Sequence, residues 1–245
     1  MTARCALVTG ASRGIGAAIS RRLAAEGFEL TLTARNEGPL AALGEELAAA
    51  GARVHTVTAD LSSEDGVERV AAAHLERQPR LHLLVLNAGM ALAGPVADFP
   101  LRRLDRMVAV NVRAPLRLVQ VCLPALRAAA GEDPERGTRV VALASMSGVV
   151  AEPQLGPYGA TKAALISLCE AISVEESGSG VNATALSPGF VDTDMGAWAT
   201  DHIDRSSMLA AEDVAELVVA LTHLTARAVV PNLVVSRAGD QLWRA

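Results

Sequence analysis

The chain has 245 residues, of which 51% are hydrophobic and only 2% aromatic, and it carries a formal net charge of −5. This length allows one large domain or two small ones, and the core must be aliphatic. An acidic balance without a Lys/Arg-rich tract argues against nucleic acid as a partner, and no apolar run approaches the roughly 20 residues of a membrane-spanning helix.

The three cysteines, Cys5, Cys122 and Cys169, are far apart and show neither metal-binding nor redox spacing. We therefore expect reduced thiols that pack in the core of a cytoplasmic protein. Because the first predicted strand begins near Arg4, we also expect no signal peptide.

Short apolar runs alternate with longer alanine-rich stretches along the whole chain. This alternation predicts a parallel sheet with helices on both faces. Without a repeat or a linker, it indicates a single doubly wound α/β domain over residues 1–245. The seven predicted strands are residues 4–8, 30–33, 54–58, 81–86, 139–144, 181–186 and 233–235.

Local signals mark the ends of the first three helices. Gly27 and Gly51 are typical of the residues that close a helix. Ser62 with Asp65 predicts a capping box at the start of the third helix, and Pro79 predicts its end.

A glycine-rich segment, residues 9–16, stands between the first strand and the first helix and reads Thr-Gly-Ala-Ser-Arg-Gly-Ile-Gly. Glycines at positions 10, 14 and 16 let the backbone turn tightly and approach a pyrophosphate, which the free N–H groups of the helix N-terminus then bind. The alternative is a tight strand-to-helix turn that holds no ligand.

The end of the second strand separates the two nicotinamide cofactors. A site for NAD offers a carboxylate to the ribose hydroxyls at this position, whereas a site for NADP offers an arginine to the 2′-phosphate. Here the chain has Arg35, and Arg13 lies in the glycine loop. The pattern favours NADP(H) over NAD(H), although a shifted register that uses Glu37 would favour NAD(H).

The chain contains one tyrosine and one lysine, Tyr158 and Lys162, and they stand four residues apart. All the other basic residues that carry a permanent charge are arginines, so Lys162 marks a position where a guanidinium is unsuitable. Residues four apart share a helix face. A cation near the phenol is expected to lower its pKa from about 10, which suits proton transfer; an incidental helical pair is the alternative.

Other signals carry less weight. The acidic residues Asp192, Asp194, Asp201 and Asp204 are interpreted as a solvated loop, so we expect no metal site. The histidines lack ligand spacing, and without a Gly-x-Ser-x-Gly elbow a serine hydrolase has no support.

Taken in order, these and further motifs resemble the short-chain dehydrogenase/reductase family over nearly the whole chain. Each motif is weak alone, but the ordered series is specific, and it implies a Rossmann-type domain. The series is Thr9 to Gly16, Asp60-Leu61, Asn87-Ala88-Gly89, Asn111, Ser145, Tyr158-x-x-x-Lys162, and Pro188-Gly189 with Thr193.

The resemblance implies four catalytic residues. Tyr158 would be the general acid that protonates a carbonyl oxygen, and Lys162 would lower its pKa and hold the nicotinamide ribose. Ser145 would bind the substrate oxygen, and Asn111 would hold a water beside the lysine. Ser147 competes with Ser145, but it would point to the opposite side of an extended segment.

The resemblance also implies a cofactor site at the carboxyl ends of the strands, where ligands bind in open α/β sheets. The cofactor-binding residues would be Gly10, Ser12, Arg13, Gly14, Ile15, Gly16, Arg35, Asp60, Leu61, Asn87, Ala88, Gly89, Asn111, Tyr158, Lys162, Pro188, Gly189, Val191 and Thr193.

The expected activity is the NADPH-dependent reduction of a ketone or aldehyde to an alcohol. A substrate loop at about residues 190–211 is short for the family, which suggests an open site or a bulky or carrier-borne substrate, and a 3-oxoacyl-thioester reductase is one alternative. A cofactor-binding regulatory protein without turnover is another. From position alone, Met146, Gln154, Phe190 and Met195 are expected to enclose the substrate.

We also expect a homodimer or homotetramer. In the family, subunits pair through the helix that here contains Pro115 and Pro124 and through the one that follows it. The two prolines are expected to bend their helix. The apolar residues within 163–172 of the following helix would serve equally well to face the sheet.

Overall fold

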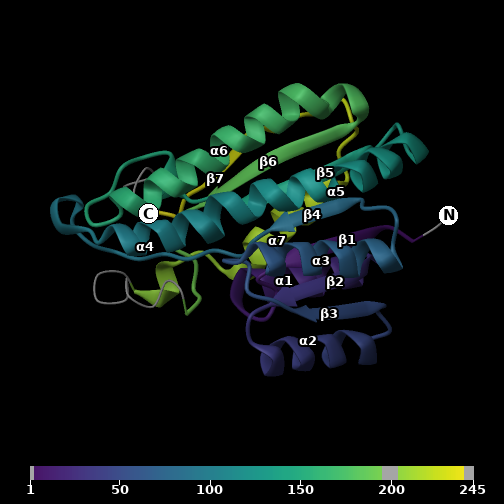
Figure 1. Ribbon diagram of the computed structural model, residues 1–245, viewed down its shortest axis with the longest axis horizontal. Helices are drawn as coiled ribbons and strands as arrows, with labels where there is room; N and C mark the ends of the chain where they lie inside the picture. The colour runs from purple at the N-terminus through teal and green to yellow at the C-terminus, as the bar shows by residue number, and fades with distance from the viewer. Residues whose placement is uncertain (1–2, 195–203, 240–245) are drawn as a thin grey trace.

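A seven-stranded parallel sheet forms the centre of the computed structural model, which describes residues 3–194 and 204–239 (Figure 1). The strand order is β3-β2-β1-β4-β5-β6-β7, so the chain winds outward in both directions from β1. All seven predicted strands are confirmed. They are β1 (Cys5–Thr9), β2 (Glu29–Ala34), β3 (Val54–Thr58), β4 (Leu83–Leu86), β5 (Thr138–Leu143), β6 (Val181–Pro188) and β7 (Asn232–Val235).

Two strand boundaries differ from the predictions by two residues, and the others differ by one residue or none. β4 begins at Leu83 rather than at Leu81, because the Leu81 N–H donates to the carbonyl of Ala125 in a helix and not to a neighbouring strand. β6 continues to Pro188, because β7 pairs with its last residues. The apolar pattern of the sequence does not show that Leu81 bonds to a helix or that the end of β6 pairs with β7.

The helices cover both faces of the sheet and form two aliphatic cores. They are α1 (Gly14–Ala25), α2 (Glu37–Ala49), α3 (Glu64–Arg77), α4 (Leu101–Val108), α5 (Ala114–Glu132), α6 (Gly156–Glu176) and α7 (Ala211–Thr222). One core joins α1, α2 and α7 to one face, and the other joins α3, α5 and α6 to the opposite face. Neighbouring strand residues such as Leu7 and Val8 enter different cores because side chains alternate across a strand.

Two glycines close helices as predicted. Gly27 and Gly51 adopt φ angles of +78° and +92°, which only glycine reaches at little cost. The N–H of Gly27 donates to Ala24 O and that of Phe28 to Leu23 O, at 3.0 Å each. This is the Schellman pattern, and it satisfies carbonyls that the end of α1 leaves free.

The predicted cap of the third helix is wrong by one residue. Ser63, not Ser62, caps α3, and its Oγ accepts from the N–H of Gly66 at 3.1 Å. The Ser62 N–H instead donates to the Asp60 carboxylate at 2.9 Å. Because Ser62 belongs to a turn with Asp60, the helix begins one residue later and Ser63 becomes its cap. Asp65 still lies in the first turn of α3, where its negative charge interacts favourably with the helix dipole.

The helical stretch after residue 100 is interrupted once. A π-helical turn, η2 (Ala109–Arg113), joins α4 to α5, and Figure 1 shows the three segments as one long rod. Pro115 lies in the first turn of α5, while α5 continues through Pro124. The departure from α geometry thus lies ahead of Pro115, whose ring and missing N–H disfavour a regular α-helix there.

The apolar side of α6 is directed toward the sheet. Leu165, Cys169 and Ile172 are buried in the core shared with α3 and α5. Of the two uses that the sequence left open for the apolar residues within 163–172, these three face the sheet. Within the described residues, every helix is too short or too polar to span a membrane.

Candidate active site

The predicted catalytic side chains meet at the carboxyl edge of the sheet. Ser145 follows β5, and Tyr158 and Lys162 lie in the first two turns of α6. The Ser145 hydroxyl lies close enough to the Tyr158 phenol to lower its pKa through hydrogen bonding, and the Lys162 Nζ lies 5.7 Å from the centre of the Tyr158 ring. The structure therefore gathers three of the four residues at one place.

Lys162 is fixed by a main-chain contact. Its side chain is buried, and its Nζ donates to the carbonyl of Leu143 at 2.6 Å. Burial lowers the pKa of Lys162 to about 8, because a low-dielectric environment disfavours the charged form. At neutral pH most of the lysine remains protonated.

The predicted direction of the pKa shift of Tyr158 is wrong. Burial raises the pKa of this phenol to about 12, and the hydrogen bond from Ser145 opposes that rise only in part. Lys162 is not among the causes, since its ammonium lies over the ring and is directed at Leu143 rather than at the hydroxyl. The phenol is accordingly protonated at neutral pH.

The structure favours Ser145 over Ser147 as the serine beside Tyr158, but not for the reason expected from the sequence. Residues after Ser145 form a 3₁₀ turn, η3 (Met146–Gly148), instead of an extended segment, and Ser145 caps it by accepting from the Ser147 N–H at 3.2 Å. The hydroxyl of Ser145, not that of Ser147, bonds to the tyrosine.

Two glycines that the sequence reasoning missed let η3 pack against α6. A Cβ at Gly159 would lie 2.4 Å from the Ser147 carbonyl oxygen, and one at Gly148 would lie 2.8 Å from the main chain of Lys162. Neither distance is tolerable for a real side chain. The position of Gly159 next to the tyrosine was the available signal.

Asn111 lies in the π-helical turn and is fully buried. Its side-chain amide bonds to both main-chain groups of Met90, each at 2.8 Å, and donates to the Thr161 hydroxyl at 3.0 Å. The side chain thus ties the loop after β4 to α6, one residue from Lys162. Pro115, four residues on, has no N–H to donate to the Asn111 carbonyl.

The glycine loop has the tight geometry that a pyrophosphate site requires. Gly10 and Gly14 adopt positive φ angles of +63° and +53°, which favour glycine. A Cβ at Gly16 would lie 2.2 Å from the Gly10 oxygen. Ser12 and Ile15, also predicted here, are half-buried.

Thr9 and Asn87 hold this loop against β4. The Thr9 hydroxyl donates to Val85 O and accepts from the N–H groups of Asn87 and Ala88. The Asn87 amide donates to the carbonyls of Thr9 and Gly10 at 2.9 and 3.0 Å. Asn87 was predicted to line the cofactor, and its observed contacts give it a role in shaping the loop.

Gly89 provides space next to Lys162. A Cβ there would lie 3.4 Å from the Lys162 Nζ and 3.6 Å from the Asn111 Oδ1. Leu61, predicted to meet the adenine, is buried in the core that includes α3.

The two arginines predicted to bind a 2′-phosphate are both exposed, but only one is free of a carboxylate. The Arg13 Nη1 donates to the Asp194 carboxylate at 2.9 Å. Arg35 directly follows β2. The pKa of Asp60 is lowered mainly by the hydrogen bond from the main-chain N–H of Ser62, and the positive charges of Arg35 and Arg106 lower it further.

The segment after β6 lies against the glycine loop. The Gly189 N–H donates to Val235 O at 2.8 Å, and Val191 forms a bridge to Leu209. A Cβ on Gly14 would lie 3.0 Å from the Thr193 side chain. Pro188, Gly189, Val191 and Thr193 are therefore brought to the same edge as the predicted cofactor residues.

The four residues predicted to enclose the substrate are Met146, Gln154, Phe190 and Met195, and those that the structure describes differ widely in exposure. Met146, the first residue of η3, is fully buried, and its contact with substrate stays a prediction. Gln154 is exposed and has a positive φ of 69°, and Phe190 is half-buried. Met195 lies outside the described residues, as do residues 196–203 of the predicted substrate loop.

The acidic residues of that loop have local partners. Asp192 pairs with Arg205, Asp194 pairs with Arg13, and Asp204 caps a short turn by accepting from the Ser206 N–H. Asp201 lies outside the described residues.

Comparison with known proteins defines the class. The family model for short chain dehydrogenases matches residues 4–204, so the chain belongs to the short-chain dehydrogenase/reductase family, whose members are oxidoreductases. A sulfoacetaldehyde reductase of Chromohalobacter salexigens is 34% identical, with 98% of this chain and 96% of that protein covered.

Two further proteins illustrate the range of relatives. A 3-oxoacyl-[acyl-carrier-protein] reductase of rhamnolipid biosynthesis in Pseudomonas aeruginosa is 33% identical, with coverage of 89% of this chain and 82% of that one. An alcohol dehydrogenase from the archaeon Thermococcus sibiricus, solved in complex with 5-hydroxy-NADP, has a TM-score of 0.86 at 28% identity and covers 97% and 99% of the two chains.

Proposed function

We propose that the chain uses NADPH to reduce a ketone or aldehyde to an alcohol, with Tyr158 as the proton donor. The observation that carries this proposal is the contact of the Tyr158 phenol with the Ser145 hydroxyl at the carboxyl edge, beside the Lys162 ammonium. A nicotinamide bound at this edge supplies the hydride that the carbonyl carbon accepts. The remaining chemistry belongs to the side chains.

Tyr158 suits the direction of reduction. With a pKa raised to about 12, its phenol carries a proton at neutral pH and donates it to the oxygen of the carbonyl as negative charge develops there. Ser145 donates a second hydrogen bond to that oxygen and positions it. Oxidation of an alcohol needs the phenolate and is accordingly slow at neutral pH.

Lys162 places a buried positive charge 5.7 Å from the centre of the Tyr158 ring and donates to Leu143 O. This charge is not among the causes that shift the pKa of the phenol, so its proposed role is to hold the ribose hydroxyls of the nicotinamide beside Tyr158. A guanidinium would have to occupy the narrow space beside Gly89. This explains why the chain's only lysine is here rather than another arginine.

The glycine loop and its surroundings fit a nicotinamide dinucleotide. A Cβ at Gly10, Gly14 or Gly16 would crowd neighbouring protein atoms, so the tight loop requires glycine at these positions. The loop leads into the N-terminus of α1, which attracts phosphate. The exposed guanidinium of Arg35, at the position where an NAD site has an acid, favours NADP(H). The solved relative from Thermococcus sibiricus binds an NADP derivative.

A 3-oxoacyl thioester is the more specific candidate substrate. The relative from Pseudomonas aeruginosa reduces a 3-oxoacyl group on a carrier protein, while the Chromohalobacter relative is named for a small aldehyde. We place the thioester first because the substrate loop at about residues 190–211 is short for the family, which suits a bulky or carrier-borne substrate.

The experiment is a steady-state measurement of NADPH consumption with matched substrates. A 3-oxoacyl thioester, the corresponding oxoester and a small aldehyde are compared, and Tyr158→Phe serves as the control for chemistry. We expect Tyr158→Phe to lose about 10²- to 10⁴-fold in kcat, the usual contribution of a general acid. Full activity of that variant contradicts the mechanism; NADPH binding without turnover on any substrate supports the regulatory alternative.

We further propose a homodimer or homotetramer in the cytoplasm. Leu116 on α5 is 40% exposed beside a cavity between α5 and the start of α3, and such apolar exposure fits an interface between helices of two subunits. The three free thiols are buried and fit a reducing compartment. Light scattering on the purified protein tests the assembly.

A further inference from the structure

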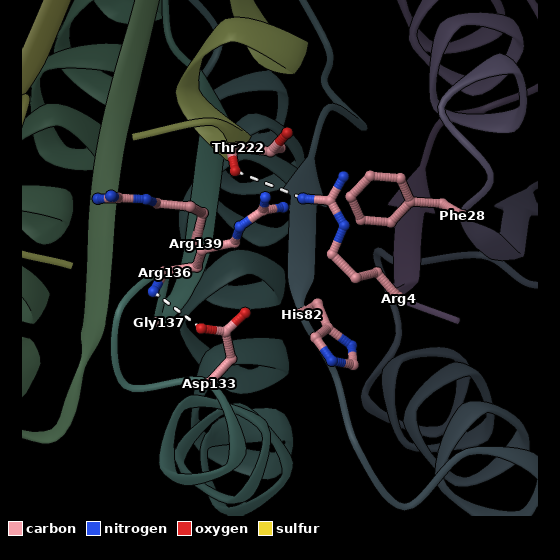
Figure 2. A pocket seen from close by; sticks show the side chains of 8 residues that line it. All are labelled: Arg4, Phe28, His82, Asp133, Arg136, Gly137, Arg139 and Thr222. Atoms are coloured by element: carbon pink, nitrogen blue, oxygen red, sulfur yellow. Dashed lines mark hydrogen bonds between the residues drawn. The ribbon is translucent and has the colours of Figure 1, made fainter. Parts of the chain in front are cut away.

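A small cavity lies at the amino-terminal edge of the sheet, opposite the edge that carries Tyr158 (Figure 2). It is enclosed by residues at the starts of β1, β4 and β5 and at the ends of α5 and α7. Its volume of about 20 Å³ admits one particle of about the size of a water molecule.

Two guanidinium groups face each other across this cavity. Figure 2 shows the side chains of Arg4 and Arg136 pointing toward one another. Arg4 stacks on the ring of Phe28 at 4.3 Å and donates to the carbonyl of Thr222. After burial, the charge of Arg136 is the largest cause that lowers the pKa of Arg4, as expected for two like charges at close range.

A third arginine adds a buried charge. Arg139 is only 3% exposed, and its terminal nitrogens donate to the carbonyls of Leu224, Thr225 and Ala228. Its Nε is buried and has no hydrogen-bond partner among the described residues. Neutral carbonyls solvate this cation but do not balance its charge.

The lining contains too little negative charge to compensate. Asp133 is its one carboxylate, and its Oδ1 accepts from the main-chain N–H of Arg136 at 3.1 Å. Burial lowers the pKa of His82, so this imidazole is neutral at pH 7. Arg4, Arg136 and Arg139 are not in ion pairs with any of the described residues. Glu26, outside the lining, also raises the pKa of Arg4, but it is paired with Arg22. Within the lining, three positive charges against one negative charge leave an excess that attracts an anion.

We infer that the cavity is a binding site for one halide-sized anion, chloride in the simplest case, held between the guanidinium groups of Arg4 and Arg136. The bound charge cancels the repulsion between the two arginines. The volume excludes phosphate and sulfate from the interior. Because the anion binds the folded arrangement of these arginines, it stabilises the fold by mass action.

The test measures thermal unfolding as chloride replaces gluconate at constant ionic strength. At a chloride concentration about ten times the Kd, the folding equilibrium constant rises about 11-fold, and the midpoint rises by roughly 3 to 6 °C for a chain of this size. Arg136→Gln, at an exposed position, keeps the fold and loses this dependence. Arg102→Gln on α4 removes the same charge elsewhere and keeps it.

Crystals grown in bromide locate the ion directly. We expect an anomalous peak within hydrogen-bonding distance of both Arg4 and Arg136, and NADPH-dependent turnover unchanged in Arg136→Gln because the site is remote from Ser145 and Tyr158. A water at this position in bromide crystals overturns the inference. Equal chloride dependence in Arg136→Gln and Arg102→Gln overturns it as well.

Discussion

The guanidinium of Arg13 donates to the carboxylate of Asp194 at 2.9 Å, and this bond links the glycine loop to the segment that follows β6. The two residues are 181 positions apart in the chain, and both side chains are largely exposed. Arg13 is also one of the two groups proposed to bind the 2′-phosphate of NADPH. Asp194 and that phosphate therefore compete for one cation.

Removing this competitor should favour NADPH. Asp194→Asn frees Arg13, and because exposed ion pairs contribute about 0.2 to 1 kcal/mol, we expect KM for NADPH to fall by up to about 5-fold. KM for NADH, which lacks the phosphate, should not change. Asp192→Asn, which breaks the neighbouring pair with Arg205, is the matched control. A parallel fall of both KM values in Asp194→Asn would show that Arg13 does not bind the 2′-phosphate.

Lys162→Arg should retain charge and fold but lose most activity. The larger planar group cannot donate to Leu143 O from the same position beside Gly89, so the charge moves away from the phenol. We expect kcat to fall by about 10²-fold or more, within the range for a disrupted acid–base pair. Circular dichroism checks the fold. Near-full activity would mean that the single lysine has no special role.

The buried ammonium should also leave a signature in the pH dependence of stability. The folded pKa of Lys162, about 8, lies below its ordinary value of 10.5. Below pH 8 both states are protonated and the folded state bears the full penalty of a buried charge. Between about pH 8 and 10.5 only the unfolded state binds the proton, so stability rises with pH, by on the order of 3 kcal/mol across the window.

Urea unfolding of the parent and of Lys162→Met across this window measures that contribution. The free energy of unfolding of the parent should rise relative to the variant as pH increases from 8 toward 10. Measurements stop at pH 10 because Tyr158 has the opposite effect above it. Its pKa is raised to about 12 in the folded state, so only the unfolded state loses the phenol proton there, and the free energy of unfolding falls as pH increases. Parallel pH curves for the two proteins would indicate an unshifted lysine.

Gly16→Ala should damage the glycine loop. The added Cβ would lie 2.2 Å from the Gly10 oxygen, and relief of that clash must move the main chain. We expect a loss of about 1 to 3 kcal/mol in the free energy of unfolding, together with weaker binding of NADPH. Calorimetric titration with NADPH and urea unfolding measure the two effects.

Gly38→Ala is the matched control for this change. Gly38 lies in α2, and a Cβ there meets nothing within 4 Å. Alanine should stabilise the helix by about 0.5 to 1 kcal/mol and leave NADPH binding unchanged. Similar losses in both variants would mean that the cost at Gly16 is not steric.

The sequence predicted all seven strands because parallel strands buried on both faces consist of short apolar runs, and β1 with its Cys-Ala-Leu-Val core is typical. It predicted that Ser145 and Tyr158 belong to one site, because the family motifs preserve their order, but it did not predict that the two side chains interact directly. The shift of the cap from Ser62 to Ser63 was out of reach, since it depends on where the Asp60 carboxylate points.

Three other features depend on the folded environment and have no local signal. The pKa of Tyr158 is governed by the burial that surrounding elements create, which outweighs any effect of its neighbour on the helix. The Arg13–Asp194 pair joins segments from opposite ends of the chain. The clustering of Arg4, Arg136 and Arg139 at one edge of the sheet has the same origin.

The bond from Lys162 to the Leu143 carbonyl fixes the position of the ammonium relative to the last residue of β5. Any change that shifts the end of β5 moves the ammonium and, through α6, the phenol. Substitutions deep in the sheet, such as Val141→Ala on the same strand, should therefore alter turnover without touching substrate or cofactor. Under the proposed mechanism, the position from which Tyr158 delivers its proton would depend on the register of the central sheet.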